Sequence, residues 1–145
     1  METDKEVELP PEMEQWKAKA ELTFWGWVGC AFERVDERRI VVSLDVKPRH
    51  LNLIGILHGG VHATMIDSAM GLAAMIARPN AGVVTTHLNL NYVAPVRSGR
   101  ILVEAEIVHL SRRTATTQAR VRTEDGELLA YGTGTFRMLE SQTGR

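Results

Sequence analysis

The sequence predicts an α+β domain in which a curved antiparallel β-sheet wraps around one long buried helix, with a short helix near the N-terminus. Three observations predict this fold. Residues 59–77 are almost all small apolar residues or strong helix formers. After them, apolar residues recur at every second position, which is the strand period, in segments up to residue 138. Two further strand-like runs precede the helix, and a curved sheet is the simplest cover for it.

The elements before the long helix follow from local signals. Prolines at positions 10 and 11 precede a helical pattern, and proline costs no hydrogen bond in a helix's first turn. A polar connection at 35–38 separates the two strand-like runs, and the aromatic residues at 24, 25 and 27 are expected to plug one end of the core. We expect a flexible tail over 1–10, a helix over 11–22, strands over 27–35 and 39–47, and a loop over 48–58.

The long helix and the strands after it are marked by a change of period. Apolar residues lie all round the helix rather than along one stripe, so we expect it to be buried on most sides. Arg78 and Pro79 end it. Leu88, Leu90 and Tyr92 then alternate with polar residues in the next strand. Three more strands are expected near 101–108, 114–123 and 128–138.

The length and composition of the chain limit the classes of protein to which it can belong. The chain has 145 residues, enough for one domain, which we place at 11–140 with a flexible tail at 141–145. A formal net charge of −1 argues against a nucleic-acid partner. One cysteine fits a reducing compartment. No secretory signal is visible at the N-terminus, and Asp67 interrupts the longest apolar run. We therefore expect a cytoplasmic protein with no membrane contact.

Two features of the long helix point to chemistry. Asp67 is the single charged residue between Gly59 and Ala77, where an ionised carboxylate is costly unless it is bonded or faces a cleft. Gly59 and Gly60 place backbone N–H groups in the first turn, where the helix dipole is positive and a ligand can approach closely. Such donors suit a developing oxyanion. The alternatives are a structural aspartate bonded to its neighbours and a plain loop-to-helix turn.

The spacing of these features predicts a shared site. Asp67 lies eight residues beyond Gly59, roughly 12 Å along a helix axis. A nucleophile or base has to lie within about 3 Å of the atom it serves. One helix therefore cannot bring both groups to one carbonyl. If both act, Gly59 of one subunit combines with Asp67 of another across a two-fold axis.

The run from Asn52 to Asp67 resembles the motif of hotdog-fold acyl-CoA thioesterases of the PaaI-like and acyl-CoA thioesterase 13 type. It reads N-x-x-G-x-x-H-G-G, with the aspartate eight residues after the first glycine of the pair. The segment from Asn89 to Val96 resembles the strand and proline turn that follow in the same family, and the similarity spans about residues 24–138. The resemblance implies a hotdog fold and hydrolysis of an acyl-CoA to CoA and a free acid.

The resemblance also implies residue roles. The Gly59 amide would polarise the thioester carbonyl, and Asn52 and His58 would shape the approach and hold the carbonyl or a water. Asp67 of the partner subunit would act as nucleophile or as general base. Thr85 matches the family's hydroxyl position for orienting water, although a one-residue register shift would exchange it with the adjacent Thr86.

Substrate contacts are expected from further positions. Gly60 lies within the motif, and Tyr92 lies in the later strand segment that also resembles the family. Arg97 and Arg113 fall where the family contacts CoA phosphates, which suit the arginine fork. Arg112 is an alternative to Arg113, and either arginine could be a solvated turn residue. The acyl pocket could be lined by Tyr92, Met65, Met70 and Ile54, and the acyl group could be aryl, medium-chain or long-chain.

No metal or separate cofactor is expected, since coenzyme A is part of the substrate. His58 and His62 are four residues apart, but a catalytic zinc site needs a third protein ligand that the sequence does not supply. Two other functions remain open: a hotdog enoyl-CoA hydratase or dehydratase, and a non-catalytic acyl-CoA-binding protein. The expected assembly is a homodimer with shared active sites, paired into a dimer of dimers, hence a homotetramer.

Overall fold

The computed structural model describes residues 11–36 and 39–139. The tails expected at 1–10 and 141–145, and the tip of the first hairpin at 37–38, lie outside the described residues. The elements, in chain order, are α1 Pro11–Ala20, α2 Phe24–Val28, β1 Ala31–Val35, β2 Arg39–Val46, the short 3₁₀ helix η1 Pro48–His50, α3 Gly59–Ala77, β3 Gly82–Tyr92, β4 Gly99–Leu110, β5 Thr114–Thr123 and β6 Leu128–Leu139.

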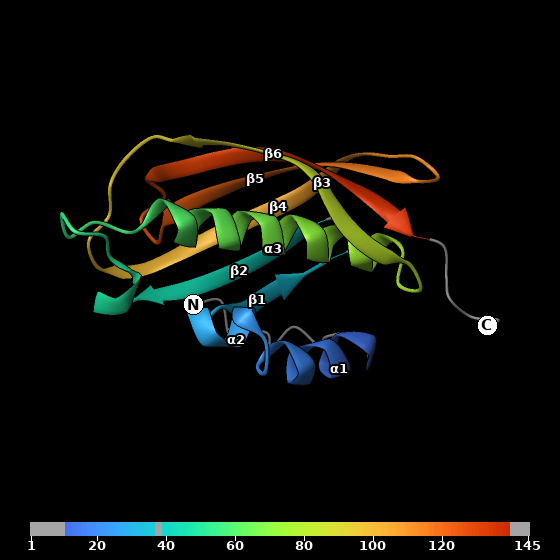
Figure 1. The fold of residues 1–145 in the computed structure, drawn as a ribbon, viewed down its shortest axis with the longest axis horizontal. Helices are drawn as coiled ribbons and strands as arrows, with labels where there is room; N and C mark the ends of the chain where they lie inside the picture. Colours follow the sequence, from blue (N-terminus) through green and yellow to red (C-terminus); the bar gives the residue numbers. More distant parts are fainter. Residues whose placement is uncertain (1–10, 37–38, 140–145) are drawn as a thin grey trace, which may run out of the picture.

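The six strands form one antiparallel sheet that curves around α3 (Figure 1). Its strand order is β1-β2-β4-β5-β6-β3, so α3 lies in the connection that carries the chain from β2 to the far edge of the sheet. The predicted α+β fold with a curved sheet and a short N-terminal helix is confirmed. β3 pairs with β6 on one side, and no described strand pairs with its other side.

Helix α3 presents one face to the sheet and leaves another partly open. By length and composition it could cross a membrane, but it contacts five of the six strands as a core helix does. The opposite face is half-buried. It carries residues at the spacing of successive helical turns, among them Thr64, Asp67, Ser68 and Met75. The expectation of burial on most sides is therefore wrong for a single chain. The buried residues are His62, Met65, Ile66, Ala69, Met70, Ala73 and Ala74.

The segment before β1 differs from the prediction. Residues 24–28 form helix α2, and the first strand begins at Ala31 rather than near residue 27. Gly29 ends the helix in the left-handed conformation, with φ of 98°, and donates its N–H to the Trp25 carbonyl at 3.1 Å. Trp25 is buried, whereas Phe24 and Trp27 are 59% and 77% exposed, so one aromatic residue rather than three enters the core.

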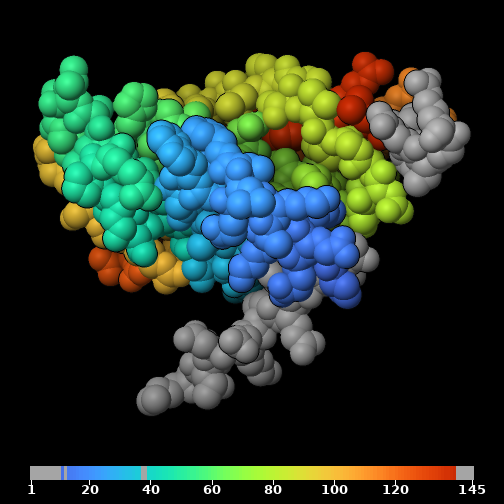
Figure 2. Space-filling model, turned by 60° about the horizontal axis from the view of Figure 1, so that its bottom comes forward, coloured from blue at the N-terminus to red at the C-terminus, as the bar shows by residue number. Residues whose placement is uncertain are grey.

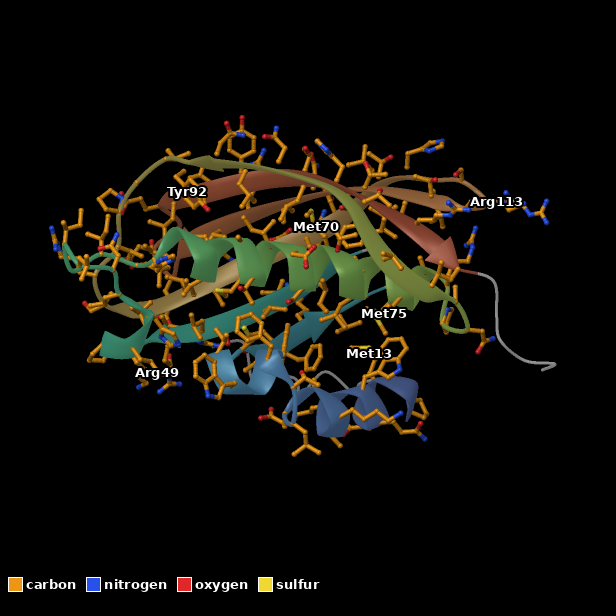
Figure 3. All side chains as sticks on the ribbon, viewed as in Figure 1. Met13, Arg49, Met70, Met75, Tyr92 and Arg113 are labelled. Carbon is orange, nitrogen blue, oxygen red and sulfur yellow. The ribbon has the colours of Figure 1, made fainter. Side chains whose placement is uncertain are left out.

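Helices α1 and α2 lie against the side of the molecule that the sheet leaves open. In Figure 2 their blue surface lies between the teal residues after β2 and the yellow-green surface of β3, with a hollow beside it. Met13 of α1 is buried in the core, on the same side of the ribbon as Met75 of α3 (Figure 3). A pocket of about 200 Å³ lies in this region, lined by Trp16, Ala20, Trp25, Phe32, Ser68 and Leu72.

The loop before α3 is tied down by a buried histidine. His50 accepts the N–H of Lys47 at its Nδ1 (2.9 Å), so its Nε2 carries the proton and donates to the Val28 carbonyl at 2.6 Å. The carbonyl of His50 in turn accepts the N–H of His58, at 2.9 Å. The N-cap residue of α3 is thereby tied, through His50, to the N-terminal segment.

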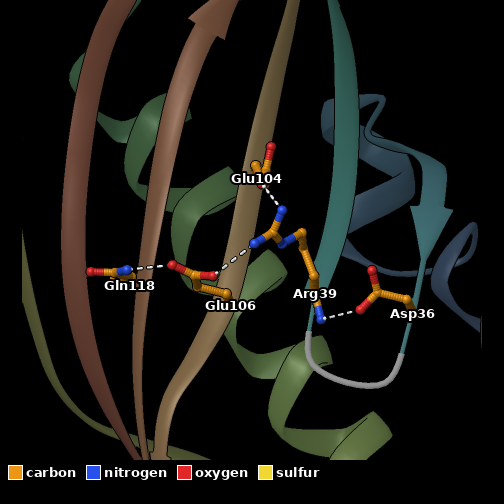
Figure 4. Close-up of polar contacts among 5 residues, drawn as sticks. All are labelled: Asp36, Arg39, Glu104, Glu106 and Gln118. Atoms are coloured by element: carbon orange, nitrogen blue, oxygen red, sulfur yellow. Dashed lines mark hydrogen bonds and ion pairs between the residues drawn. The ribbon is translucent and has the colours of Figure 1, made fainter.

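The outer face of the sheet is polar and charged. The guanidinium of Arg39 lies 3.1 Å from a carboxylate oxygen of Glu104 and 3.2 Å from one of Glu106 (Figure 4). Glu106 also accepts a hydrogen bond from Gln118, and the backbone N–H of Arg39 donates to Asp36. Arg39, Asp36 and Gln118 are exposed, and Glu104 and Glu106 are half-buried at the surface, so each ion pair adds only about 0–1 kcal/mol.

Candidate active site

The start of α3 leaves one backbone N–H group free. His58 is the N-cap, and its Nδ1 accepts the N–H of Gly60 at 2.8 Å. The N–H of Val61 donates to the His58 carbonyl at 2.9 Å. Among the described residues, nothing accepts the N–H of Gly59. This amide points from the positive end of a helix and is the donor available to a ligand oxygen.

Glycine is favoured at both positions by the close approach of side chains. A Cβ atom on Gly59 would lie 3.1 Å from the hydroxyl oxygen of Tyr92 and 3.2 Å from Cζ of the same ring. A Cβ atom on Gly60 would lie 2.9 Å from Nδ1 of His58. The Tyr92 hydroxyl also donates a hydrogen bond to the Gly59 carbonyl at 2.8 Å. The glycine pair therefore lets two side chains contact the first turn directly.

Asn52 supplies a second donor beside Gly59. Its Oδ1 accepts the backbone N–H groups of Ile54 and Ile56, at 3.1 and 3.2 Å. These two bonds assign the orientation of the amide, because the NH₂ end could not accept them. The NH₂ group donates to no described residue. Asn52 and Gly59 line the same pocket, so two free donors are available to one ligand.

The pocket beside these donors has a volume of about 390 Å³. Its polar residues come from the loop, the first turns of α3 and the end of β3, and its remaining walls are apolar. It brings together three of the predicted site residues, Asn52, Gly59 and Tyr92, with a histidine that the sequence had suggested only as a metal candidate. The lining residues are Asn52, Ile56, Leu57, Gly59, His62, Tyr92, Val93, Ala94 and Pro95.

His62 is the polar residue of this pocket that sequence reasoning missed. It is 3% exposed, and its ring meets the Tyr92 ring edge-on, with 5.7 Å between ring centroids. Its Nδ1 is buried and bonds to no described residue. Burial lowers the pKa of the imidazole below its ordinary value of 6.5. The available signal was its position three residues after Gly59, on the same helix face.

Asp67 is held by a hydroxyl from the neighbouring strand. The Thr85 side chain of β3 donates to Oδ1 of Asp67 at 2.7 Å. Thr86 instead donates to the carbonyl of Thr135, at 3.0 Å, which decides between the two threonines left open by the sequence. Asp67 is half-buried, and its Oδ2 accepts no hydrogen bond from a described residue. The carboxylate is thus oriented on one side and open on the other.

Thr64 and Ser68, the hydroxyl residues nearest to Asp67 along the helix, do not bond to its carboxylate. Thr64 donates its hydroxyl to the carbonyl of Gly60 at 2.8 Å, and no bond joins Asp67 to Ser68 among the described residues. The helix runs unbroken from Gly59 to Ala77, so the separation of roughly 12 Å between Gly59 and Asp67 stands. Within one chain, therefore, the Gly59 amide and the Asp67 carboxylate are too far apart to act on the same carbonyl.

The two predicted arginines lie far apart in the chain's fold. Arg97 donates to the carbonyls of Ile54 and Gly55, both at 3.2 Å, and so clamps the loop that contains Asn52. Arg113 is exposed in the turn between β4 and β5, at the opposite end of the ribbon from Tyr92 (Figure 3). Its neighbour Arg112 is also exposed.

Three of the residues predicted to line the acyl pocket lie elsewhere in the structure. Met65 and Met70 are fully buried in the core, and Ile54 is exposed on the loop, so none of the three lines the pocket that contains Tyr92. His58 caps the helix and His62 is buried, and within residues 11–36 and 39–139 no group of three or more His, Cys, Asp or Glu side chains could hold a metal ion.

A curved antiparallel sheet wrapped around one long helix defines a hotdog-fold protein. Comparison with known proteins agrees. Residues 54–130, more than half of the chain, match the Thioesterase superfamily. The chain belongs to this superfamily, in its PaaI-like hotdog group, and is a thioester hydrolase.

Individual relatives support this placement. Acyl-coenzyme A thioesterase 13 of Homo sapiens is 28% identical over 96 residues, which cover 65% of this chain and 69% of that protein. The structure of a mutant phenylacetic acid degradation protein PaaI from Thermus thermophilus is 34% identical, with a TM-score of 0.75 over 80% of this chain and 98% of that one. A thioesterase from Haemophilus influenzae shares the fold, with a TM-score of 0.85 at 24% identity over 91% of this chain and 93% of that one.

Proposed function

We propose that this protein hydrolyses acyl-CoA thioesters, at sites that combine Gly59 of one subunit with Asp67 of another. Water and the thioester give the CoA thiol and a free carboxylic acid. The observation that carries the proposal is the pairing of Thr85 with Asp67 at 2.7 Å, which orients a carboxylate on the helix that also carries the free Gly59 amide. The hydroxyl donor fixes the direction of the carboxylate, as a catalytic base or nucleophile requires.

The oxyanion would be stabilised by two donors. The Gly59 N–H and the Asn52 NH₂ line one pocket, and both lack acceptors among the described residues. A thioester carbonyl oxygen placed between them would gain negative charge in the transition state, when these donors stabilise it most. His58 supports this arrangement by capping Gly60, which leaves Gly59 as the free amide of the turn.

Asp67 would supply the attack. As a general base it takes a proton from water while the water oxygen bonds to the carbonyl carbon. As a nucleophile, its own oxygen bonds to that carbon, and water later hydrolyses the acyl-aspartate. In both routes the carbon–sulfur bond breaks and the departing sulfur leaves as thiolate or takes a proton. Thr85 keeps one carboxylate oxygen oriented while the open oxygen reacts.

A second copy of the chain would pair along the free edge of β3. The free edge of β3 is long and exposes apolar side chains such as Val84 and Tyr92, so it is suited to pair with another strand. Antiparallel pairing of two β3 strands about their middle residues brings the Tyr92 end of one beside the Thr85 end of the other. The partly open face of α3, which is rich in small residues, can then face its counterpart.

This dimer would bring together catalytic groups that lie too far apart in a single chain. The pocket with Gly59 and Asn52 in one subunit would meet the Asp67 and Thr85 of its partner, twice per dimer. Arg97 beside the loop and Arg113 from the far end are proposed to contact the CoA phosphates. A dimer of dimers, giving a homotetramer, and a cytoplasmic location complete the proposal.

The direct test replaces Asp67. Asp67→Asn and Asp67→Ala should lower kcat for release of CoA thiol from a panel of acyl-CoAs by about 10²- to 10⁴-fold, the usual contribution of a positioned base. Asp45→Asn, which changes an exposed carboxylate on β2, is the matched control and should keep wild-type rates. Wild-type turnover by a folded Asp67→Ala protein would contradict the proposal. Single-turnover hydrolysis in ¹⁸O-labelled water tests the nucleophilic route. Label in the Asp67 carboxylate would establish that route, because general-base catalysis puts the label only into the product acid.

A further inference from the structure

His62 is a buried polar residue at the proposed site, yet the proposed hydrolysis gives it no role. Its ring lines the pocket that contains the free donors of Gly59 and Asn52. It is 3% exposed, and its Nδ1 is buried without a hydrogen bond to any described residue. Tyr92 packs edge-on against the ring, and the Tyr92 hydroxyl is already used by the Gly59 carbonyl.

An imidazole in this position is costly for the fold. A neutral ring carries one donor and one acceptor, and burying either without a partner costs more than burying an apolar side chain of the same size. Since residues on the other turns of this buried face are Met, Ile and Ala, a leucine would pack there without that cost. A buried polar group whose partner is missing is therefore a candidate for contact with whatever fills the pocket.

The surroundings of His62 indicate which kind of ligand group could form a hydrogen bond with its ring. Burial lowers the pKa of the ring, which keeps it uncharged at neutral pH. The other residues that line the pocket carry no charge, and the polar side chains among them are those of Tyr92 and Asn52. An ionised ligand group would be desolvated here without a counter-charge, so an uncharged hydroxyl or amide suits the site.

The position of His62 along α3 relates it to the thioester. Gly59 and His62 are three residues apart on one helix face, with a rise of about 4.5 Å between them. A substrate whose carbonyl oxygen meets the Gly59 amide therefore extends toward His62 over a few bonds. Two groups of an acyl-CoA lie at that distance: a hydroxyl on the third carbon of the acyl chain, and the amide nearest the sulfur in the CoA arm.

We propose that His62 is a specificity-determining residue that hydrogen-bonds an uncharged hydroxyl or amide of the substrate close to the thioester. This inference rests on the proposed hydrolysis and adds a selective contact to it. His62 takes no part in bond making or breaking. It favours substrates that bring the missing hydrogen-bond partner into the pocket and disfavours analogues that leave the ring unpaired.

Two matched substrate pairs test the two sources of the polar group. The first pair is 3-hydroxybutyryl-CoA and butyryl-CoA. The second is the butyryl thioester of N-acetylcysteamine and the butyryl thioester of an alkanethiol of equal length, which lacks the amide. We expect wild-type kcat/KM to favour the polar member of one pair by about tenfold, the value of one net hydrogen bond. The pair that shows the preference identifies the source.

Variants of His62 complete the test. His62→Leu should abolish that preference while keeping turnover of the apolar member, and His62→Gln, which can still hydrogen-bond, should restore part of it. His109→Leu, at an exposed position on β4, should behave as wild type. Because Nδ1 of the ring has no hydrogen-bond partner in the described fold, His62→Leu should also keep or raise the melting temperature. A purely structural histidine would instead lower the melting temperature and leave the preference intact.

The outcomes separate the two proposals. If wild-type protein hydrolyses the thioesters but prefers neither polar substrate, or if His62→Leu retains the preference, the role of His62 is wrong and the hydrolase function stands. If His62→Leu slows all substrates equally and unfolds at lower temperature, the residue is structural and the inference is again wrong. If wild-type protein releases thiol from none of the substrates, both proposals fall.

Discussion

The hydroxyl of Tyr92 donates a 2.8 Å hydrogen bond to the carbonyl oxygen of Gly59, joining the last residue of β3 to the first residue of α3. The same peptide group is also held at its other end, because the N–H of Gly60 donates to Nδ1 of His58 at 2.8 Å. The peptide between the two glycines therefore has a fixed orientation. Since the first turn is rigid, the free Gly59 amide also points in a fixed direction, as a preorganised donor must.

Removing the Tyr92 hydroxyl should loosen this turn without unpacking it. Tyr92→Phe keeps the ring against His62 but leaves the Gly59 carbonyl without its donor. We expect kcat/KM for acyl-CoA hydrolysis to fall by about three- to tenfold, the range of one neutral hydrogen bond. Tyr131→Phe, at an exposed position on β6, is the matched control. Equal rates for both variants in a steady-state assay would show that the Tyr92 bond is not needed for catalysis.

The hydroxyl of Thr85 should matter more than that of Thr86. Thr85→Val is nearly isosteric but removes the donor to Asp67, and hydrogen bonds to charged groups contribute about 1.5–3 kcal/mol. We expect kcat to fall by about ten- to a hundredfold, and Thr85→Ser to recover most of it. Thr86→Val loses a bond to the Thr135 carbonyl instead and should keep its turnover. The reverse order of the two valine variants would contradict the assignment of the site to Thr85.

The shared site predicts complementation between inactive chains. Asp67→Ala subunits retain an intact Gly59 end, and Asn52→Ala subunits retain an intact Asp67 end. Mixing the two after partial unfolding should form heterodimers with one complete site each, and up to about half of the dimers are mixed after random exchange. Thiol release should reappear only in the mixture. Mass spectrometry that shows mixed dimers without activity would contradict a site built from two subunits.

Much of the fold follows from local patterns. The bounds of α3, Gly59–Ala77, coincide with the predicted 59–77, because a glycine pair begins the helix and Pro79 follows its end. The later strands were predicted to within a few residues from their alternation, although β3 begins earlier, at Gly82, and β4 ends later, at Leu110. Helix α2 was missed because its five residues are too few to show a helical period and its aromatic residues favour strands.

The site was predictable only in part, for a physical reason. Motif residues such as Asn52, Gly59 and Asp67 are close in sequence, so their spacing along one loop and helix could be reasoned about. The partners that orient them come from β3, which is distant in the chain: Thr85 meets Asp67 and Tyr92 meets Gly59. Such pairings depend on how helix and strand cross. His62 was undervalued because the absence of a partner can be recognised only in three dimensions.

Two glycines of β6 should differ in their tolerance of alanine. A Cβ atom on Gly132 would lie 2.7 Å from the backbone carbonyl oxygen of Asn89, which cannot move without disturbing β3. A Cβ atom on Gly134 would lie 2.6 Å from Cε of Met70, the end of a flexible side chain. Urea unfolding should show Gly132→Ala to be less stable than wild type by about 1–3 kcal/mol, with a smaller loss for Gly134→Ala. Equal losses would contradict this account.

The buried His62 should also make the fold sensitive to acid. Burial lowers its pKa in the folded protein, so below pH 6.5, the ordinary value, the unfolded chain binds the extra proton more readily than the folded chain. The contribution of His62 to the free energy of unfolding therefore keeps its full value above pH 6.5 and decreases as the pH falls from there toward the lowered folded-state pKa of His62. Unfolding free energies measured in urea between pH 8 and pH 5 should therefore decline less steeply for His62→Leu than for wild type, with His109→Leu as the control for removing an exposed histidine. Parallel curves for wild type and His62→Leu would contradict a pKa of His62 that burial lowers in the folded protein.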